Sequence, residues 1–255
     1  MFSRKKTTHL PLHDTRFEGA SIAPNEPLCV IGDIHGQISC LTSLMNKIAQ
    51  DYTPSRLVFV GDYIDRGDQS AQVLTRLYEL SKTDPETVFL MGNHEEMMLS
   101  FLDDPAKSGN RWMRYGGLQT IASFGSFRLV EHNTSEALVA ARDGLKEAMP
   151  DGLESWLRDL PRFWKSGNLG VVHAGADPAK PLDAQDPKTL TWGHSDFGRR
   201  AREDGLWIAH GHTIFDMPQE KNGIISIDTG AYATGRLTAA HITAGNVEFV
   251  QGLKT

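Results

Sequence analysis

Five apolar runs stand at intervals along this chain, and each leads directly into a possible metal ligand. The runs are rich in Val, Ile, Leu and Phe, a composition typical of strands buried on both faces of a sheet. In open α/β sheets, ligands bind beyond the carboxyl ends of the strands. We therefore expect an α/β fold in which one rim collects the polar residues that follow residues 28–31, 57–60, 87–91, 169–172 and 206–209.

The segments between the first three runs have the apolar spacing of helices. Residues 39–50 carry apolar side chains at 41, 44, 45 and 48, and residues 70–80 repeat the pattern. This predicts a β-α-β-α-β beginning with parallel strands. Residues 96–165 have the character of a mostly helical insertion that covers the sheet. Strand patterns return near the C-terminus, at 224–228, 236–243 and 246–251.

The composition limits the class of protein. The 255 residues contain no linker between the motifs, so we expect one domain over 1–255, in which 1–25 is a flexible or loosely packed N-terminal segment. A formal charge of −6 gives no support to nucleic acid or an anionic membrane as a partner. No signal peptide and no apolar stretch of roughly 18 residues is visible, and two cysteines suit a reducing compartment. We expect a cytoplasmic protein, and nothing in the sequence indicates its oligomeric state.

The residues that follow the runs form an oxygen and imidazole ligand set large enough for two metal ions. A mixed set without thiolate suits divalent Mn, Fe or Zn and does not choose among them. Two such ions, about 3.5–4 Å apart, are a standard means of attacking a phosphate ester with water. The candidate ligands are Asp33, His35, Asp62, Asn93, His173 and His212.

Four further residues stand next to these ligands in the sequence. A buried pair of Asp65 and His94 would keep the imidazole charged near neutral pH, and such an imidazole can protonate a leaving oxygen. Arg66 has the planar fork that binds a phosphoryl group with two hydrogen bonds. Glu95 is expected to orient Arg66 or His94 rather than to bind a metal.

The order and spacing of the motifs resemble those of a known family. Gly-Asp-x-His-Gly at 32–36, Gly-Asp-x-x-Asp-Arg-Gly at 61–67 and Gly-Asn-His-Glu at 92–95 are followed by His-Ala-Gly at 173–175 and Gly-His-Thr at 211–213. Over roughly residues 27–243 the chain resembles the phosphoprotein phosphatase family of calcineurin-like metallophosphoesterases, in its bacterial serine/threonine branch.

The resemblance implies a β-sandwich of two mixed sheets flanked by helices, with a dinuclear centre at one rim that takes two divalent ions, Mn²⁺ first among them. It implies that Asp33, His35 and Asp62 hold one ion, and that Asp62 is shared with a second ion held also by Asn93, His173 and His212. Water activated there would attack phosphorus directly. His94, paired with Asp65, would protonate the leaving group. Substrate contacts would come from Arg66, Asn93, His94 and the residue at position 194.

Position 194 departs from the family pattern. Bacterial relatives carry an arginine shortly after a tryptophan, whereas here His194 follows Trp192. A protonated His194 could bind phosphate with a shorter reach and fewer donors than arginine. Arg114, Arg199 and Arg200 are the other candidates for the missing positive charge.

The expected activity is that of a phosphomonoesterase, a serine/threonine protein phosphatase that could also accept phosphotyrosine. The alternative is a diadenosine tetraphosphatase-like nucleotide hydrolase, a class that usually reads Gly-Asp-x-x-Ala-Arg-Gly in the second motif. Asp65 therefore favours the protein phosphatase. A third reading is a non-catalytic module that binds phosphoproteins, and His194 is its only support. The expected substrate is a phosphorylated protein or a small phosphate ester.

Overall fold

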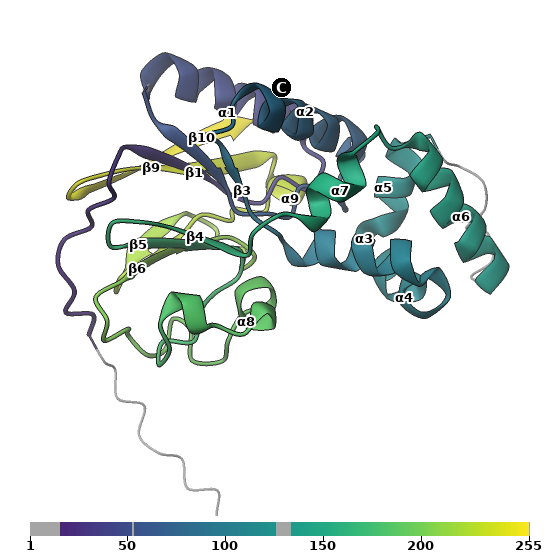
Figure 1. Ribbon diagram of the computed structural model, residues 1–255. Helices are drawn as coiled ribbons and strands as arrows, with labels where there is room; N and C mark the ends of the chain where they lie inside the picture. Colours follow the sequence, from purple (N-terminus) through teal and green to yellow (C-terminus); the bar gives the residue numbers. More distant parts are fainter. Residues whose placement is uncertain (1–15, 53, 126–133, 255) are drawn as a thin grey trace, which may run out of the picture.

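The computed structural model describes residues 16–52, 54–125 and 134–254. Two five-stranded sheets lie face to face, and a group of helices packs against one end of the pair (Figure 1). The sandwich of two mixed sheets flanked by helices is confirmed. Part of the predicted N-terminal segment, 1–15, lies outside the described residues. Residues 16–25 form no helix or strand, but Ile22 is buried and the Phe17 ring packs edge-on against Trp207, 5.2 Å between centroids.

The first sheet has the order β10-β9-β1-β2-β3. Its strands are β1 (Leu28–Ile31), β2 (Arg56–Phe59), β3 (Val88–Phe89), β9 (Arg236–Thr243) and β10 (Asn246–Leu253). β1 pairs in parallel with β2, and β2 with β3, whereas β9 joins β1 antiparallel. The predicted β-α-β-α-β beginning is therefore present, with α1 (Ile38–Asp51) and α2 (Ser70–Thr83) as its helices.

The second sheet has the order β4-β5-β6-β8-β7. Its strands are β4 (Phe163–Ser166), β5 (Leu169–Val172), β6 (Trp207–His210), β7 (Gln219–Lys221) and β8 (Ile224–Ser226). The sequence patterns did not predict β4 or β7. β7 is an edge strand of sequence Gln-Glu-Lys that buries no residue, so it lacks the apolar signal on which strand prediction depends.

The two sheets share one apolar core. Small and β-branched side chains on their facing sides interdigitate, among them Val30, Val58, Val171, Ala209 and Ile225. The opposite side of the first sheet is covered by α1 and α2, through residues such as Leu41, Leu44, Val73 and Leu74. Burial on both sides explains why these strands read as continuous apolar runs.

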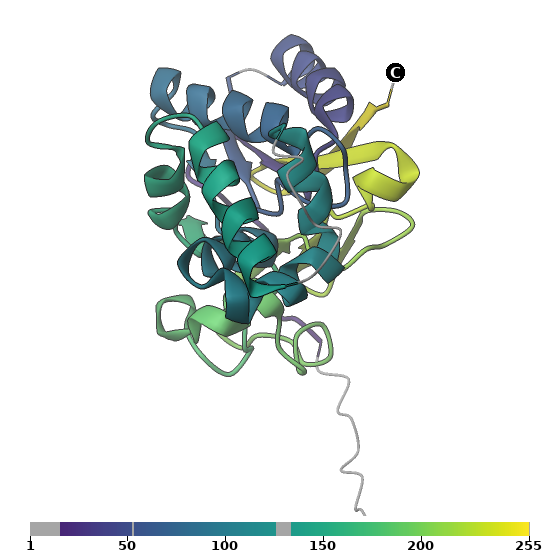
Figure 2. The same ribbon diagram turned by 90° about the vertical axis from the view of Figure 1, so that its right-hand side faces the viewer.

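The helical insertion is confirmed, and it begins earlier than predicted. It comprises α3 (Asn93–Asp103), α4 (Pro105–Trp112), a π-helical turn η1 (Met113–Gly117), α5 (Leu118–Ser123), α6 (Ser135–Ala148) and α7 (Leu153–Arg158). These helices gather in front of the sandwich in the turned view (Figure 2). Short elements complete the chain: η2 (Leu182–Ala184), α8 (Pro187–Trp192) and α9 (Ala231–Thr234). Within the described ranges no helix is long and apolar enough to cross a membrane.

Candidate metal centre

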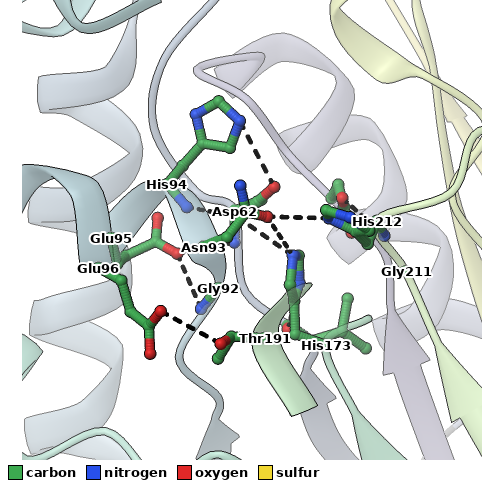
Figure 3. A network of polar contacts seen from close by, with 12 residues as sticks. Asp62, Gly92, Asn93, His94, Glu95, Glu96, His173, Thr191, Gly211 and His212 are labelled. Carbon is green, nitrogen blue, oxygen red and sulfur yellow. Dashed lines mark hydrogen bonds and ion pairs between the residues drawn. The ribbon is translucent and has the colours of Figure 1, made fainter. Parts of the chain in front are cut away.

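The candidate ligands lie at strand ends and at one helix start. Asp33 and Asp62 follow β1 and β2, Asn93 begins α3, His173 follows β5 and His212 follows β6. Because the two sheets pack face to face, side chains from both reach the same rim (Figure 3). The structure therefore brings together residues that are up to 179 positions apart, as in the hydrogen bond from His212 N to Asp33 Oδ2 (2.9 Å).

Asp62 lies between two groups of possible ligands. On one side its Oδ2 is 3.6 Å from His35 Nε2 and 3.9 Å from His94 Nε2. On the other, its Oδ1 is 3.4 Å from His173 Nε2, and His212 belongs to the same group. A carboxylate with one oxygen facing each group is placed to bridge two cations.

Asn93 connects the histidines of the second group. Its Oδ1 lies 2.9 Å from both His173 Nε2 and His212 Nδ1 (Figure 3). The amide oxygen and the two imidazole nitrogens are three possible metal-ligand atoms that lie close together. This is the arrangement that a single divalent ion could replace with coordination bonds.

Backbone carbonyls set the tautomers of the buried histidines. His35 Nδ1 donates to Ile64 O (2.7 Å) and His173 Nδ1 donates to Val60 O (3.0 Å), so each Nε2 faces the site. Burial lowers the pKa of His35 to about 3 and that of His212 to about 4. His35 therefore combines both features: a neutral imidazole with Nδ1 anchored and Nε2 turned inward is suited to bind a metal. At His173 burial lowers the pKa, but the Asp62 carboxylate outweighs it and leaves that pKa raised.

Asp33 supplies the observation that tests whether this donor set fits a cation. Its Oδ1 is buried and has no hydrogen-bond partner among the described residues. Burial, with Asp228 and Asp62 nearby, raises the pKa of Asp33 well above its usual range. A buried carboxylate with one oxygen that lacks a donor, close to two other carboxylates, is costly without a positive charge. The residues present therefore fit divalent metal.

The backbone at the site is held in an unfavourable conformation. Within the described ranges six non-glycine residues have positive φ, and five of them are His35, Asp62, Asp65, Arg66 and His212. Such strain persists only where the surroundings over-determine it, and it concentrates at functional sites.

Glu95 provides much of this constraint. Its carboxylate accepts hydrogen bonds from the backbone N–H groups of Asp62 (2.8 Å), Tyr63 (2.8 Å) and Gly92 (3.1 Å). The expectation that Glu95 orients Arg66 or His94 is corrected: it holds the backbone of the Asp62 loop. The three buried N–H donors would otherwise lack partners, which explains a buried acid at this position.

The predicted Asp65–His94 pair is present and is embedded in the helical insertion. His94 Nδ1 is 2.6 Å from Asp65 Oδ2, which also accepts from Trp112 Nε1 (2.8 Å). Thr120 Oγ1 donates to Asp65 Oδ1 (2.6 Å). Burial lowers the pKa of His94, but the carboxylates of Asp62 and Asp65 outweigh it and leave that pKa above its ordinary value.

Sequence reasoning missed the contributions of Trp112 and Thr120. A tryptophan in a helical insertion reads as core, and Trp112 is indeed fully buried. Its indole N–H has a function that apolar spacing does not reveal, and Thr120 carries no motif at all. Asp228 was also missed: it is buried, and its carboxylate accepts from Gly230 N (2.8 Å) beside the charged cluster.

Arg66 lies next to the acid. One terminal nitrogen of its half-buried guanidinium is 3.4 Å from His94 Nε2, and the guanidinium carbon stands 4.7 Å above the Tyr232 ring. His194 instead faces Asp177, at 3.9 Å, although it lines the same small cavity as His212. Arg200 pairs with Glu203 on the surface. Of the side chains in this comparison, Arg66 is the one in contact with His94.

Comparison with known proteins gives consistent results. The sequence profile of the calcineurin-like phosphoesterases matches residues 26–216. The bis(5'-nucleosyl)-tetraphosphatase PrpE (asymmetrical) of Oceanobacillus iheyensis is 28% identical over 233 residues, covering 82% of this chain and 86% of the relative.

Two examples illustrate the solved structures that share the fold. A candidate diadenosine tetraphosphatase superposes with a TM-score of 0.60 at 22% identity, covering 92% of this chain and 100% of that one. A Saccharomyces cerevisiae protein serine/threonine phosphatase with similarity to human PP5 gives 0.57 at 19% identity, covering 91% and 81%.

Proposed function

The chain belongs to the calcineurin-like phosphoesterase family, and we propose that this metallophosphoesterase hydrolyses dinucleoside polyphosphates in the manner of a bis(5'-nucleosyl)-tetraphosphatase. The observation that carries the proposal is its 28% identity, over 82% of its length, to a relative of that name. A protein phosphatase, favoured by the second motif alone, is the competing activity.

The contacts of Asp65 weaken the argument for a protein phosphatase. The Asp65 carboxylate binds three side chains, those of His94, Trp112 and Thr120. The backbone N–H of Asp65 also donates to Ser70 Oγ at 3.1 Å. The carboxylate thus orients the acid, His94. A phosphate leaving group needs a proton less than an alkoxide does, but an oriented acid is compatible with both, so Asp65 excludes neither substrate class.

The site residues divide the chemistry among themselves. Two divalent ions held by the six candidate ligands would supply an activated water and neutralise phosphate charge. Arg66 binds the oxygens of the phosphoryl group under attack, where negative charge is concentrated. His94 holds a proton that it gives to the departing oxygen, and Asp65 stabilises the charged imidazole and fixes its ring orientation.

The test is a parallel assay of purified protein with added Mn²⁺ on three substrates: diadenosine tetraphosphate, a pSer/pThr peptide and a pTyr peptide. We expect the dinucleotide to be preferred and cleaved to ATP and AMP, the unequal pair of products. The Asp62→Asn variant controls for a contaminating phosphatase. A preference for either peptide would overturn the proposal in favour of a protein phosphatase.

A further inference from the structure

Two aromatic side chains of the described residues are exposed, and both lie against histidines of the candidate site. Tyr115 is 45% exposed and Tyr232 is 37% exposed, whereas every other Phe, Tyr or Trp within the described ranges is buried or half-buried. Both tyrosines pack edge-on against a site histidine: the Tyr115 ring centroid is 6.4 Å from that of His94, and the Tyr232 centroid is 5.4 Å from that of His35.

Pairwise contacts link four groups in the order Tyr232, Arg66, His94, Tyr115. Arg66 lies over the Tyr232 ring and approaches His94 Nε2 at 3.4 Å, and the Tyr115 ring packs edge-on against His94. Tyr232 already has a partner on its ring, since the Arg66 guanidinium stacks there with a favourable cation–π contact. Tyr115 stands on the side of the acid, where the departing group must lie if His94 protonates it.

The chain holds Tyr115 in this place by a specific local structure. Tyr115 belongs to the turn η1, which links α4 to α5 through a kink at Gly116, a residue without helical φ and ψ. The next residue, Gly116, has φ 109°, and a Cβ there would stand 2.5 Å from Arg66 N. Gly117 packs against the Trp112 indole, where a Cβ would meet ring carbon at 2.5 Å. Gly116 therefore lets this turn contact the loop that carries Asp65 and Arg66, and Gly117 lets it pack against Trp112.

We propose that Tyr115 is a specificity-determining residue that stacks on the nucleobase of the departing nucleotide. The inference rests on the proposed function and deepens it, because it says how a phosphohydrolase centre of this type would favour a nucleotide over a bare phosphate chain. A flat, exposed ring one step beyond the acid offers a π-face to any base. Arg114, exposed in the same turn, adds positive charge for a polyphosphate.

The test compares wild type with Tyr115→Ala and Tyr115→Phe on two substrates, diadenosine tetraphosphate and inorganic tripolyphosphate. The quantity compared is kcat/KM for the dinucleotide divided by kcat/KM for tripolyphosphate. We expect this ratio to fall about tenfold in Tyr115→Ala, because one stacked base contributes an effect of that size. Tyr115→Phe keeps the ring and should keep the ratio. Calorimetric binding of AMP should weaken by a similar factor in Tyr115→Ala only.

Leu118→Ala is the matched control, because Leu118 is 42% exposed in the adjacent helix α5 and should leave the ratio unchanged. If wild type cleaves the dinucleotide but Tyr115→Ala keeps both the ratio and AMP affinity, this inference alone is overturned. If Tyr115→Ala loses p-nitrophenyl phosphate activity by the same factor, the ring recognises any aryl group, which also overturns a nucleobase site. A wild type that cleaves only tripolyphosphate or p-nitrophenyl phosphate overturns both the inference and the proposed function.

Discussion

At the level of single residues, the acid assigned to His94 has a consequence that depends on the leaving group. Departure of an alkoxide requires a proton, whereas departure of a phosphate, whose second pKa is about 6, requires it much less. In His94→Asn we therefore expect turnover of an alkyl phosphate to fall at least 100-fold, and that of diadenosine tetraphosphate to fall clearly less. Steady-state kinetics at saturating Mn²⁺ give both numbers. Full turnover of the alkyl phosphate by the variant would contradict the acid role.

Thr120 acts on the acid through Asp65. Its hydroxyl donates to Asp65 Oδ1 (2.6 Å) and accepts from Asp65 N (2.9 Å), all in a buried environment. Thr120→Val keeps the shape but removes both hydrogen bonds, which should cost about 1–3 kcal/mol of unfolding free energy. It should also lower turnover of alkyl phosphates more than that of p-nitrophenyl phosphate, whose leaving group needs little protonation. Thr120→Ser should restore the wild-type ratio of turnover between the alkyl phosphate and p-nitrophenyl phosphate. An equal loss of turnover on both esters would show that Thr120 has only a structural role.

Among the secondary-structure elements, the turn η1 makes a close contact with the backbone of the loop that carries Asp65 and Arg66. Gly116→Ala places a Cβ against Arg66 N, so we expect the turn to separate from the Asp65–Arg66 loop, with activity falling at least tenfold. Gly125→Ala is the matched control: Gly125 also has positive φ, at 76°, but its added Cβ meets no atom of the described residues within 4 Å. Both variants bear the backbone cost of alanine at positive φ, about 1 kcal/mol. Similar kinetics for the two would show that the close approach is unimportant.

For the protein as a whole, metal binding and folding should be linked. The clustered carboxylates and the unpartnered Asp33 Oδ1 favour binding of cations to the folded chain only. A ligand at 100 times its Kd adds about 2.7 kcal/mol, so saturating Mn²⁺ should raise Tm by about 5–10 °C over the EDTA-treated protein. Differential scanning fluorimetry measures the shift. Asp62→Asn should lose most of it, and an equal shift in that variant would argue against the assigned site.

The stability of the protein should also fall in mild acid because of buried neutral histidine. His210, which bonds Gly211 O and Ser226 Oγ at 2.8 Å, is not a candidate ligand, and burial lowers its pKa from 6.5 to about 4. Between these values the unfolded chain binds a proton that the folded chain does not, so stability decreases as pH falls from 6.5 to 4, by up to about 3 kcal/mol. Urea titrations should show a shallower pH dependence in His210→Gln, and an unchanged slope would contradict this.

The sequence by itself determined the fold class and the broad reaction class, and it predicted the ligand set. The candidate ligands follow apolar strand patterns closely in the sequence. Each strand pattern and its ligand motif therefore lie within one short stretch of chain and can be recognised together. The sequence did not reveal the polar edge strand β7, nor that Glu95 holds the Asp62 backbone.

Only the tertiary structure decided what surrounds the catalytic pair. Trp112 and Thr120 reach Asp65 across 47 and 55 positions of sequence, and no local pattern encodes such a hydrogen bond. Likewise, the exposure of Tyr115 beside His94 depends on how a π-helical turn packs against a loop from another part of the chain. Local periodicity reports which face of an element is buried, whereas hydrogen-bond partners and the shape of a substrate site arise only when distant elements pack together.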